Sequence, residues 1–409
     1  MATSSVKYLP ANRTSPQAHT LPTSQIPTVA EQRIMNCALK ALGIPLSAKN
    51  PHKVLIPEGC TLDTAFNPRQ GSTGIVIKYT TPKGEERILK IGFEGNLCTD
   101  TLKKEVEATR KANDYFSKHT VSGVSDAQKL QFPLHPEGVA SRTAISFPYA
   151  GKDLLAITET MRTTKSPASL QIFFNTLKGS LVIAERSEEH NFFHRDVKPD
   201  NIVVDKEGGI RWIDWSSSIH YTPDYVTGRW YRSPGILSEE RKDMGIFLFS
   251  SACTLFQLVT GTPLFYSSFY QEDKDRFNRM LIHLTNVTKL FPLTNAFVES
   301  VPKNDQEKYF VCHQEKGKEC KYALQTPAHL ASYEMSLFKT WEDVKTALNK
   351  VKFDIEDDRL KEFPNLFESF LRKCLDYTKP PSLEEVSKDP LVTMIENVIN
   401  DSKKEFVAI

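Results

Sequence analysis

Residues 193–201 read Phe193-His194-Arg195-Asp196-Val197-Lys198-Pro199-Asp200-Asn201, and a second segment reads Ile210-Arg211-Trp212-Ile213-Asp214. The residues between the two segments, 202–209, predict a β-strand that ends in a Gly-Gly turn, and the second segment predicts the return strand. A hairpin of this length would bring Asp214 back beside Asn201. We therefore expect the polar residues of both segments to form one site.

These segments carry the side chains that transfer of a phosphoryl group from ATP requires. Asp196 can accept the proton of an incoming hydroxyl, and Lys198 can neutralise charge on the moving phosphoryl group. Asn201 and Asp214 offer the oxygen ligands that Mg2+ prefers in proteins. The sequence thus predicts ATP and Mg2+ as cofactors. The alternative is a polar loop without a chemical role, which would have to match the motif and the spacing of Asp214 by chance.

The two segments resemble the catalytic loop and the metal-binding segment of the eukaryotic-type protein kinases. In that family the Asp of His-Arg-Asp is the catalytic base and the Asn binds a metal ion, which implies these roles for Asp196 and Asn201. Asp214 would hold metal as well. Lys198, two positions after Asp196, is similar to the serine/threonine class rather than the tyrosine class. The resemblance implies an α+β fold with a small β-rich N-lobe and a larger helical C-lobe.

A glycine-containing turn upstream strengthens this resemblance by its order in the chain. Gly71-Ser72-Thr73-Gly74-Ile75-Val76 lies between extended segments, and Lys90 follows in Ile88-Leu89-Lys90. Glycines let backbone N–H groups approach phosphates, and a lysine on a strand adds a positive charge beside them. The kinase pattern has three glycines, and Arg69 stands where the first would be. The two inner glycine positions are intact.

A helix expected from Asp100 to about Tyr115 carries two glutamates. Kinases pair a glutamate of this helix with the strand lysine, and the resemblance implies the same pairing for Lys90. Glu105 best matches the family position, and Glu107 is the second candidate. For either residue the alternative is a solvated carboxylate on the helix surface.

The segment 144–154 predicts a strand that continues into a linker and a helix, and it resembles the hinge between the kinase lobes. Phe147 would stand at the back of the adenine pocket, although an ordinary core role fits it equally well. Pro148 lacks an N–H, but the family uses only the carbonyl there, and Ala150 would supply the N–H donor. The resemblance implies nucleotide contacts at Gly71, Ser72, Thr73, Gly74, Val76, Ile88, Lys90, Phe147, Pro148, Ala150 and Val203.

Several positions depart from the family pattern. Trp215-Ser216 follows Asp214 where kinases have Phe-Gly, and the loss of glycine restricts the backbone there. The segment 225–235 resembles the activation segment of MAP and cyclin-dependent kinases but ends in Gly235 instead of Glu. Pro380 stands where the arginine that pairs with this Glu would be. Losing both partners together avoids a buried unpaired charge.

The resemblance also bears on regulation and on support of the catalytic loop. Thr222 or Tyr225 could be phosphorylated, with Arg195 receiving the phosphate. The helix aspartate that braces the His-Arg-Asp backbone in kinases falls at Phe247 in an ungapped match. Asp243, one turn earlier, is expected to substitute for it.

The chain divides by composition into a tail, a short extension, a long domain and a second tail. Residues 1–28 are rich in Ser, Thr and Pro and are expected to be disordered. Residues 29–53 are expected to form a helical extension, and residues 396–409 are expected to form the second tail. The kinase domain spans 54–395, with the N-lobe to about 150, the C-lobe from about 151, and an insertion at about 265–365.

Two of these parts have open alternatives. The insertion, which is longer than the family core requires, could bind substrates or partners or could serve packing alone. In the extension, Gly43 and Pro45 are expected to end the helix. Its docking face is expected to comprise the apolar residues at helical spacing, Ile34, Cys37, Ala38, Ala41 and Leu42.

Bulk composition excludes several classes of function. Hydrophobic content of 40% and charged content of 25% are ordinary for a soluble protein, and a net charge of +2 gives no reason to expect nucleic-acid binding. No apolar run approaches the roughly 20 residues that span a bilayer. Seven scattered cysteines fit reduced thiols, and Cys312, His313 and Cys320 are too few ligands for a structural zinc site. We expect a cytoplasmic protein, located in the host cytoplasm if it is a secreted bacterial effector.

Three functions remain after these observations. The sequence favours a protein kinase that phosphorylates Ser or Thr of a protein substrate. A pseudokinase that binds nucleotide as a scaffold is the first alternative, although Lys90, Asp196, Asn201 and Asp214 all remain. A small-molecule or lipid kinase is the second alternative.

Overall fold

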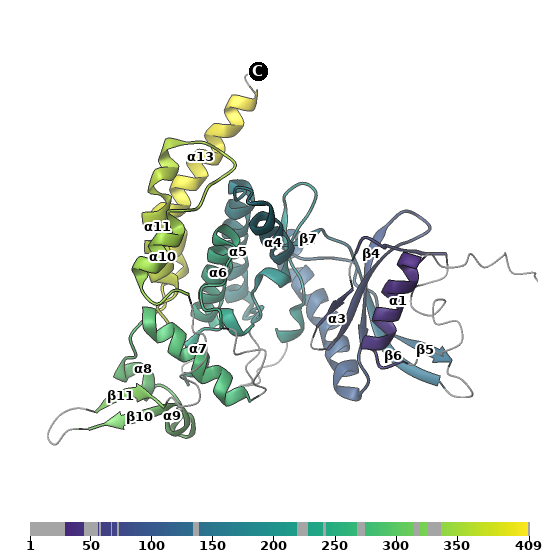
Figure 1. Cartoon of the computed structure of the whole chain (residues 1–409), viewed down its shortest axis with the longest axis horizontal. Coiled ribbons are helices and arrows are strands. Elements are labelled where there is room, and N and C mark those ends of the chain that lie inside the picture. The colour runs from purple at the N-terminus through teal and green to yellow at the C-terminus, as the bar shows by residue number, and fades with distance from the viewer. Residues whose placement is uncertain are drawn as a thin grey trace, which may run out of the picture.

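A computed structural model describes residues 29–44, 56, 59–66, 68–71, 73–133, 139–218, 228–239, 243–267, 275–314, 320–325 and 337–407. These residues form a small lobe built on a β-sheet and a larger lobe built mainly of helices (Figure 1). The predicted two-lobed α+β fold is confirmed. Ser72, Thr222, Tyr225 and the expected tail over residues 1–28 lie outside the described residues.

An antiparallel sheet forms the small lobe, with strands in the order β1-β3-β4-β6-β5 and with β2 paired to β3. Strand β4 lies in the middle of the sheet, and its Lys90 is paired with Val76 on β3 and with Ile145 on β6. Lys90 is therefore held by hydrogen-bonded strands on both sides. The strands are β1 (Thr61–Leu62), β2 (Arg69–Gln70), β3 (Gly74–Thr80), β4 (Glu86–Gly92), β5 (Gln128–Pro133) and β6 (Val139–Pro148).

Helix α1 (Val29–Ala41) shares a buried apolar core with this sheet, to which it contributes Ile34, Met35, Ala38 and Leu39. Gly43 takes a positive φ of 66° just after the helix, and the N–H of residue 44 donates to the carbonyl of Leu39 at 2.9 Å. This geometry ends the helix at Gly43, as expected, while Pro45 lies outside the described residues. Cys37, expected on the docking face, is exposed because the buried face is centred on the other residues.

Helix α3 (Asn96–Phe116) lies between the sheet and the large lobe (Figure 1). Its buried residues include Leu102 and Val106, which pack with Ile145 of the sheet. Farther along, Ala108, Ala112 and Phe116 join the core of the large lobe. Helix α3 therefore connects the cores of the two lobes.

Helix α6 (Asp243–Thr260) is the central helix of the large lobe, and it contacts α4, α5, α10 and α11. Among the described residues it is the one helix with the length and mean hydropathy (1.4) of a membrane span, and 83% of that stretch is buried inside the lobe. We therefore interpret α6 as a core helix. The other helices of the lobe are α4 (Leu154–Thr164), α5 (Leu170–His190), α7 (Arg276–Leu290), α8 (Asn295–Glu299), α9 (Lys303–Tyr309), α10 (Trp341–Leu348), α11 (Phe363–Cys374), α12 (Leu383–Ser387) and α13 (Pro390–Val407).

The expected insertion at 265–365 is built into the large lobe. Met280 and Leu284 of α7 and Val344 of α10 are fully buried in the same core as α6. Strands β10 (Phe310–His313) and β11 (Lys321–Leu324) form an antiparallel hairpin that projects from the lobe (Figure 1). Packing is thus one role of the insertion.

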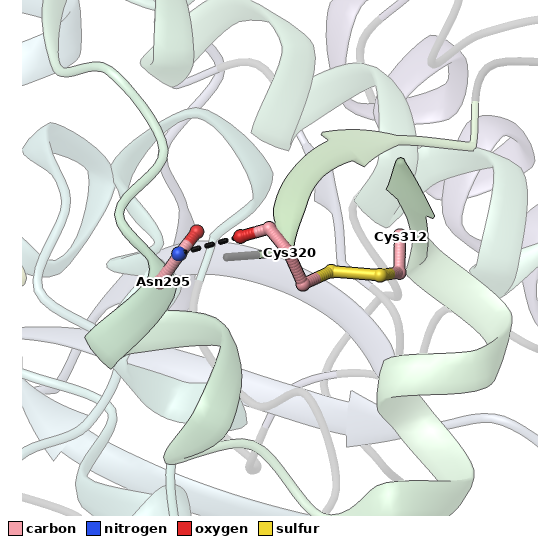
Figure 2. The surroundings of a disulfide bond; sticks show 3 residues. All are labelled: Asn295, Cys312 and Cys320. Carbon is pink, nitrogen blue, oxygen red and sulfur yellow. Dashed lines mark hydrogen bonds between the residues drawn. A yellow bond between two sulfur atoms is a disulfide. The ribbon is translucent and has the colours of Figure 1, made fainter. Parts of the chain in front are cut away.

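The structure corrects two predictions. Cys312 and Cys320 are joined by a disulfide, so the expectation of seven reduced thiols is wrong for this pair. Figure 2 shows this bond and the side chain of Asn295, whose Nδ2 donates to the carbonyl of Cys320 at 2.7 Å. The second correction concerns residues 396–407, which continue α13 instead of forming a tail. Val398 and Ile399 are buried in the core, so the domain extends beyond residue 395.

Candidate active site

A cleft of about 830 Å³ lies between the two lobes. All sequence-predicted site residues that the structure describes line this cleft, and Ser72 lies outside the described residues. The structure therefore brings the predicted set together from both lobes. The set comprises Gly71, Thr73, Gly74, Val76, Ile88, Lys90, Glu105, Phe147, Pro148, Ala150, Asp196, Lys198, Asn201, Val203 and Asp214.

Lys90 connects the small lobe to the metal-binding segment. Its Nζ lies 2.6 Å from Oε2 of Glu105 and 3.4 Å from Oδ2 of Asp214. Burial alone would lower the pKa of Lys90, but the charges of Asp214 and Glu105 raise the pKa above its ordinary value. Lys90 is therefore a fixed positive charge in the cleft.

The two candidate glutamates of α3 have different surroundings. Glu105 is 2% exposed and contacts Lys90, and burial raises the pKa of Glu105 to about 7 even though the charge of Lys90 opposes the shift. Glu107 does not line the cleft and pairs with Lys111 on the next turn, with its side chain 57% exposed. The geometry favours Glu105 over Glu107 as the partner of Lys90.

Asp196 is held by hydrogen bonds on both carboxylate oxygens. Its Oδ2 accepts from Nζ of Lys198 at 2.9 Å and from Nδ2 of Asn201 at 3.0 Å. Its Oδ1 accepts from the backbone N–H of Gly228 at 2.7 Å. Burial alone would lower the pKa of Lys198, but the charge of Asp196 raises it above its ordinary value. The Asp196 carboxylate is thus oriented beside Lys198, which stays protonated.

The predicted hairpin between the two segments consists of β8 (Ile202–Val204) and β9 (Ile210–Trp212). It returns the chain so that the N–H of Ile213 donates to the carbonyl of Asn201 at 2.9 Å. Next to this bond, His194 donates from Nε2 to the carbonyl of Ile213 at 2.9 Å. Burial lowers the pKa of His194, which keeps the ring neutral. The two segments that resemble the catalytic loop and the metal-binding segment are therefore hydrogen-bonded to each other.

Asn201 and Asp214 present oxygen atoms that fit a magnesium ion held jointly with phosphates. The Nδ2 of Asn201 donates to the backbone carbonyl and to Oδ2 of Asp196, which leaves Oδ1 as the ligand atom. Burial alone would raise the pKa of Asp214, but the charge of Lys90 and a hydrogen bond from Ser216 hold the pKa well below its usual range. In the described residues no group of three or more His, Cys, Asp or Glu could hold a metal by itself. A metal held by two protein ligands and nucleotide phosphates matches this donor set.

Contacts of Trp215 and Asp243 support the two segments. The indole of Trp215 is fully buried, stacks on Phe116 with 4.8 Å between the ring centroids, and contacts the ring of His194 at 4.5 Å. Asp243, at the start of α6, accepts from the Arg195 guanidinium at 3.2 Å. Asp243 thus reaches the His-Arg-Asp segment, through the arginine side chain.

The hinge segment continues directly from the end of β6, the strand at the back of the cleft. Phe147 on β6 is paired with Ile88 on β4, and Ala150 lies outside the strand with no hydrogen-bond partner for its N–H in the described part of the chain. Gly151 has a φ of 127°, and a Cβ there would lie 1.8 Å from the carbonyl oxygen of Val204. Only glycine fits this close approach.

Comparison with known proteins gives the family. The protein kinase domain family matches residues 149–392, which is more than half of the chain. The chain belongs to the protein kinase family. The match begins at the hinge, so the assignment of the small lobe rests on the geometry of its kinase-like sheet, Lys90 and Glu105.

The kinase resembles proteins of the cyclin-dependent group. Cyclin-dependent kinase-like 4 of Mus musculus is 32% identical over 118 residues, which cover 27% of this chain and 33% of that protein. Cyclin-dependent kinase 20 of Rattus norvegicus is 26% identical over 209 residues, covering 48% and 56% of the two chains. Cyclin-dependent kinase 20 of Homo sapiens is 27% identical over 173 residues, covering 39% and 49%. The kinase therefore spans between a third and just over half of the length of these relatives.

The structure adds residues of the kinase cleft that sequence reasoning missed. Arg69, noted only as a replaced glycine, forms an ion pair with Asp153 of the large lobe. Ser216, noted only as a departure, donates from Oγ to Oδ1 of Asp214 at 2.7 Å. The backbone donor of Gly228 has no sequence signal, because any residue but proline carries an N–H. Four further charged residues line the cleft: Lys104, Asp200, Arg232 and Arg279.

Proposed function

We propose that this chain is a protein serine/threonine kinase that transfers the γ-phosphate of ATP to a hydroxyl of a protein substrate. One observation carries the proposal. Asp196, with Lys198 and Asn201 bonded to its carboxylate, shares one cleft with the contact between Lys90 and Asp214. A base, a phosphate-binding cation and metal ligands are the groups that this reaction needs.

Each residue has a role that follows from its position. Asp196 accepts the proton of the acceptor hydroxyl, and Lys198 offsets negative charge on the phosphoryl group. Lys90, held by Glu105, binds the phosphates of the nucleotide, while the hinge at Ala150 offers an N–H to the adenine. These groups act by positioning and by electrostatic stabilisation, which account for most of phosphoryl-transfer catalysis.

Asn201 and Asp214 would hold Mg2+. When bound, the ion neutralises phosphate charge and orients the transferred group. The protein contributes the fixed directions of the two ligands: Asn201 is oriented by its bonds to Asp196, and Asp214 by Ser216 and Lys90.

A transfer assay tests the proposal. Labelled γ-phosphate from ATP should reach a generic basic protein substrate in the presence of Mg2+, and Asp196→Ala should lower the rate by at least 10²-fold. Asp358→Ala is the matched control, because that carboxylate is 93% exposed on the large lobe. Nucleotide binding without transfer by the wild type would favour the pseudokinase alternative.

The acceptor is expected to be Ser or Thr because Lys198 follows Asp196 by two positions, as in the serine/threonine class. The cyclin-dependent names of the relatives support the same class. Mass-spectrometric mapping of the products should find phosphoserine or phosphothreonine. Mainly phosphotyrosine, or transfer only to small molecules or lipids, would contradict this part of the proposal.

A further inference from the structure

The two oxygens of the Asp214 carboxylate are held by different parts of the protein. Oδ1 accepts from the hydroxyl of Ser216 at 2.7 Å, and Oδ2 faces the ammonium of Lys90 at 3.4 Å. Lys90 is anchored by Glu105 at 2.6 Å. The shorter contact of the carboxylate is therefore the one from Ser216, a residue of the metal-binding segment itself.

The backbone around Ser216 is fixed by its neighbours. Residues 215–217 form a single 3-10 turn, closed by the bond from the N–H of Ser218 to the carbonyl of Trp215 at 2.9 Å. The buried indole of Trp215 donates from Nε1 to the carbonyl of Trp212 at 3.1 Å and stacks on Phe116. Since the turn cannot shift without moving a buried tryptophan, the hydroxyl of Ser216 is a pre-oriented donor.

Asp214 itself has a backbone that needs support. Its φ is 59°, in the left-handed region that non-glycine residues seldom adopt. The side chain is 32% exposed toward the cleft, so packing alone does not fix its rotation. A hydrogen bond to one oxygen removes that freedom and leaves the remaining lone pairs in a defined direction.

We propose that Ser216 is a positioning residue that fixes the Asp214 carboxylate for a divalent cation bound with the nucleotide. The inference rests on the proposed function and adds to it a residue at a position where the kinase pattern has glycine, which could not make this bond. Partners that orient a metal ligand typically change metal affinity by 10- to 100-fold. The pre-oriented carboxylate lowers the entropy lost when the cation binds.

Three variants separate this role from a structural one. Ser216→Ala removes the hydroxyl, and Ser216→Thr retains it. Ser218→Ala is the matched control, because it removes a hydroxyl from the end of the same 3-10 turn, and that hydroxyl makes no hydrogen bond to any described residue. Thermal melts of all variants report whether the fold is kept.

The readout is binding of a non-hydrolysable ATP analogue, titrated with Mg2+ at fixed analogue concentration and repeated without metal. For Ser216→Ala we expect the Mg2+ midpoint to rise about tenfold, while metal-free binding stays the same. Ser216→Thr and Ser218→Ala should match the wild type. An unchanged midpoint in Ser216→Ala, or an equal loss without metal, would overturn the role of Ser216 alone. If the wild type shows no Mg2+-dependent binding, the proposed function fails as well.

Discussion

Arg69 of the small lobe and Asp153 of the large lobe form an ion pair across the nucleotide cleft. Asp153 also caps α4, since its Oδ1 accepts from the N–H of Ala156 at 2.8 Å. The arginine thus contacts the residue at which the chain passes from the hinge into the first helix of the large lobe. The pair joins the glycine-containing turn of the small lobe to the floor of the cleft.

Breaking this pair should speed nucleotide release. Arg69 is 46% exposed, so the contact is worth about 1 kcal/mol or less, and Arg69→Ala should raise the release rate of a fluorescent ADP up to about fivefold. Stopped-flow fluorescence measures this rate. Asp153→Asn is the second variant, because asparagine keeps the helix cap while removing the charge. Equal release rates in all three proteins would show that the pair does not restrain the lobes.

Glu105 and Glu107 provide a comparison within one helix. Glu105→Gln should lower phosphoryl transfer about tenfold or more because Lys90 loses its anchor, and Lys90→Met should lower it further. Glu107→Gln should stay within about twofold, since that exposed pair contributes little. Steady-state rates of phosphoryl transfer, measured for the three variants and the wild type, test this order. The reverse order would reject Glu105 as the partner of Lys90.

The pH dependence of unfolding should report a buried histidine. His283 is 1% exposed and donates from Nε2 to the carbonyl of Arg232 at 2.5 Å, and burial lowers the pKa of His283 to about 3. Between pH 6.5 and 3 the unfolded state binds the proton that the folded state rejects. The free energy of unfolding should therefore fall on acidification by about 1.4 kcal/mol per pH unit from this residue.

Urea unfolding at several pH values measures that slope. His283→Gln removes the titrating ring, so its slope should be shallower, with the remaining dependence arising from groups such as His194, whose pKa is also lowered by burial. His313→Gln is the control, because that histidine is exposed on the hairpin. An identical slope in His283→Gln would contradict the assignment.

Gly235 and Pro380 test the joint loss of an ion pair. A Cβ on Gly235 would lie 3.3 Å from the hydroxyl oxygen of Ser233 and 4.0 Å from both Cγ1 of Ile246 and the carbonyl oxygen of Tyr377, so the three nearest atoms include no cation. Gly235→Glu should cost about 1–3 kcal/mol of unfolding free energy, and adding Pro380→Arg should recover part of it because neighbouring sites are not additive. Thermal melts of both single variants and the double variant measure the coupling. Strict additivity would show that the two sites do not interact.

The sequence predicts the proximity of the candidate catalytic residues because they are close along the chain. Asp196, Lys198 and Asn201 lie within six positions, and a short hairpin returns Asp214 beside them. Lys90 and Glu105 required the order of motifs along the chain and the family resemblance, since no local pattern places a helix residue against a strand residue.

Contacts between distant residues were beyond such reasoning. Arg69 and Asp153 are 84 positions apart, and their pairing depends on how the two lobes are set relative to each other. Cys312 and Cys320 are only eight positions apart, but their bond depends on the hairpin of β10 and β11, which the sequence pattern did not indicate. The predicted domain end at residue 395 falls inside α13, where burial continues to Ile399.

The apolar character of α6 has a consequence for synthesis of the chain on the ribosome. Its partners include α5, which is translated before it, and α11, which is translated about a hundred residues after it. Until α11 emerges, a predominantly apolar helix lacks part of its cover, and exposed surface of this kind promotes aggregation. The nascent large lobe therefore has a long interval in which a chaperone that binds apolar segments would be needed.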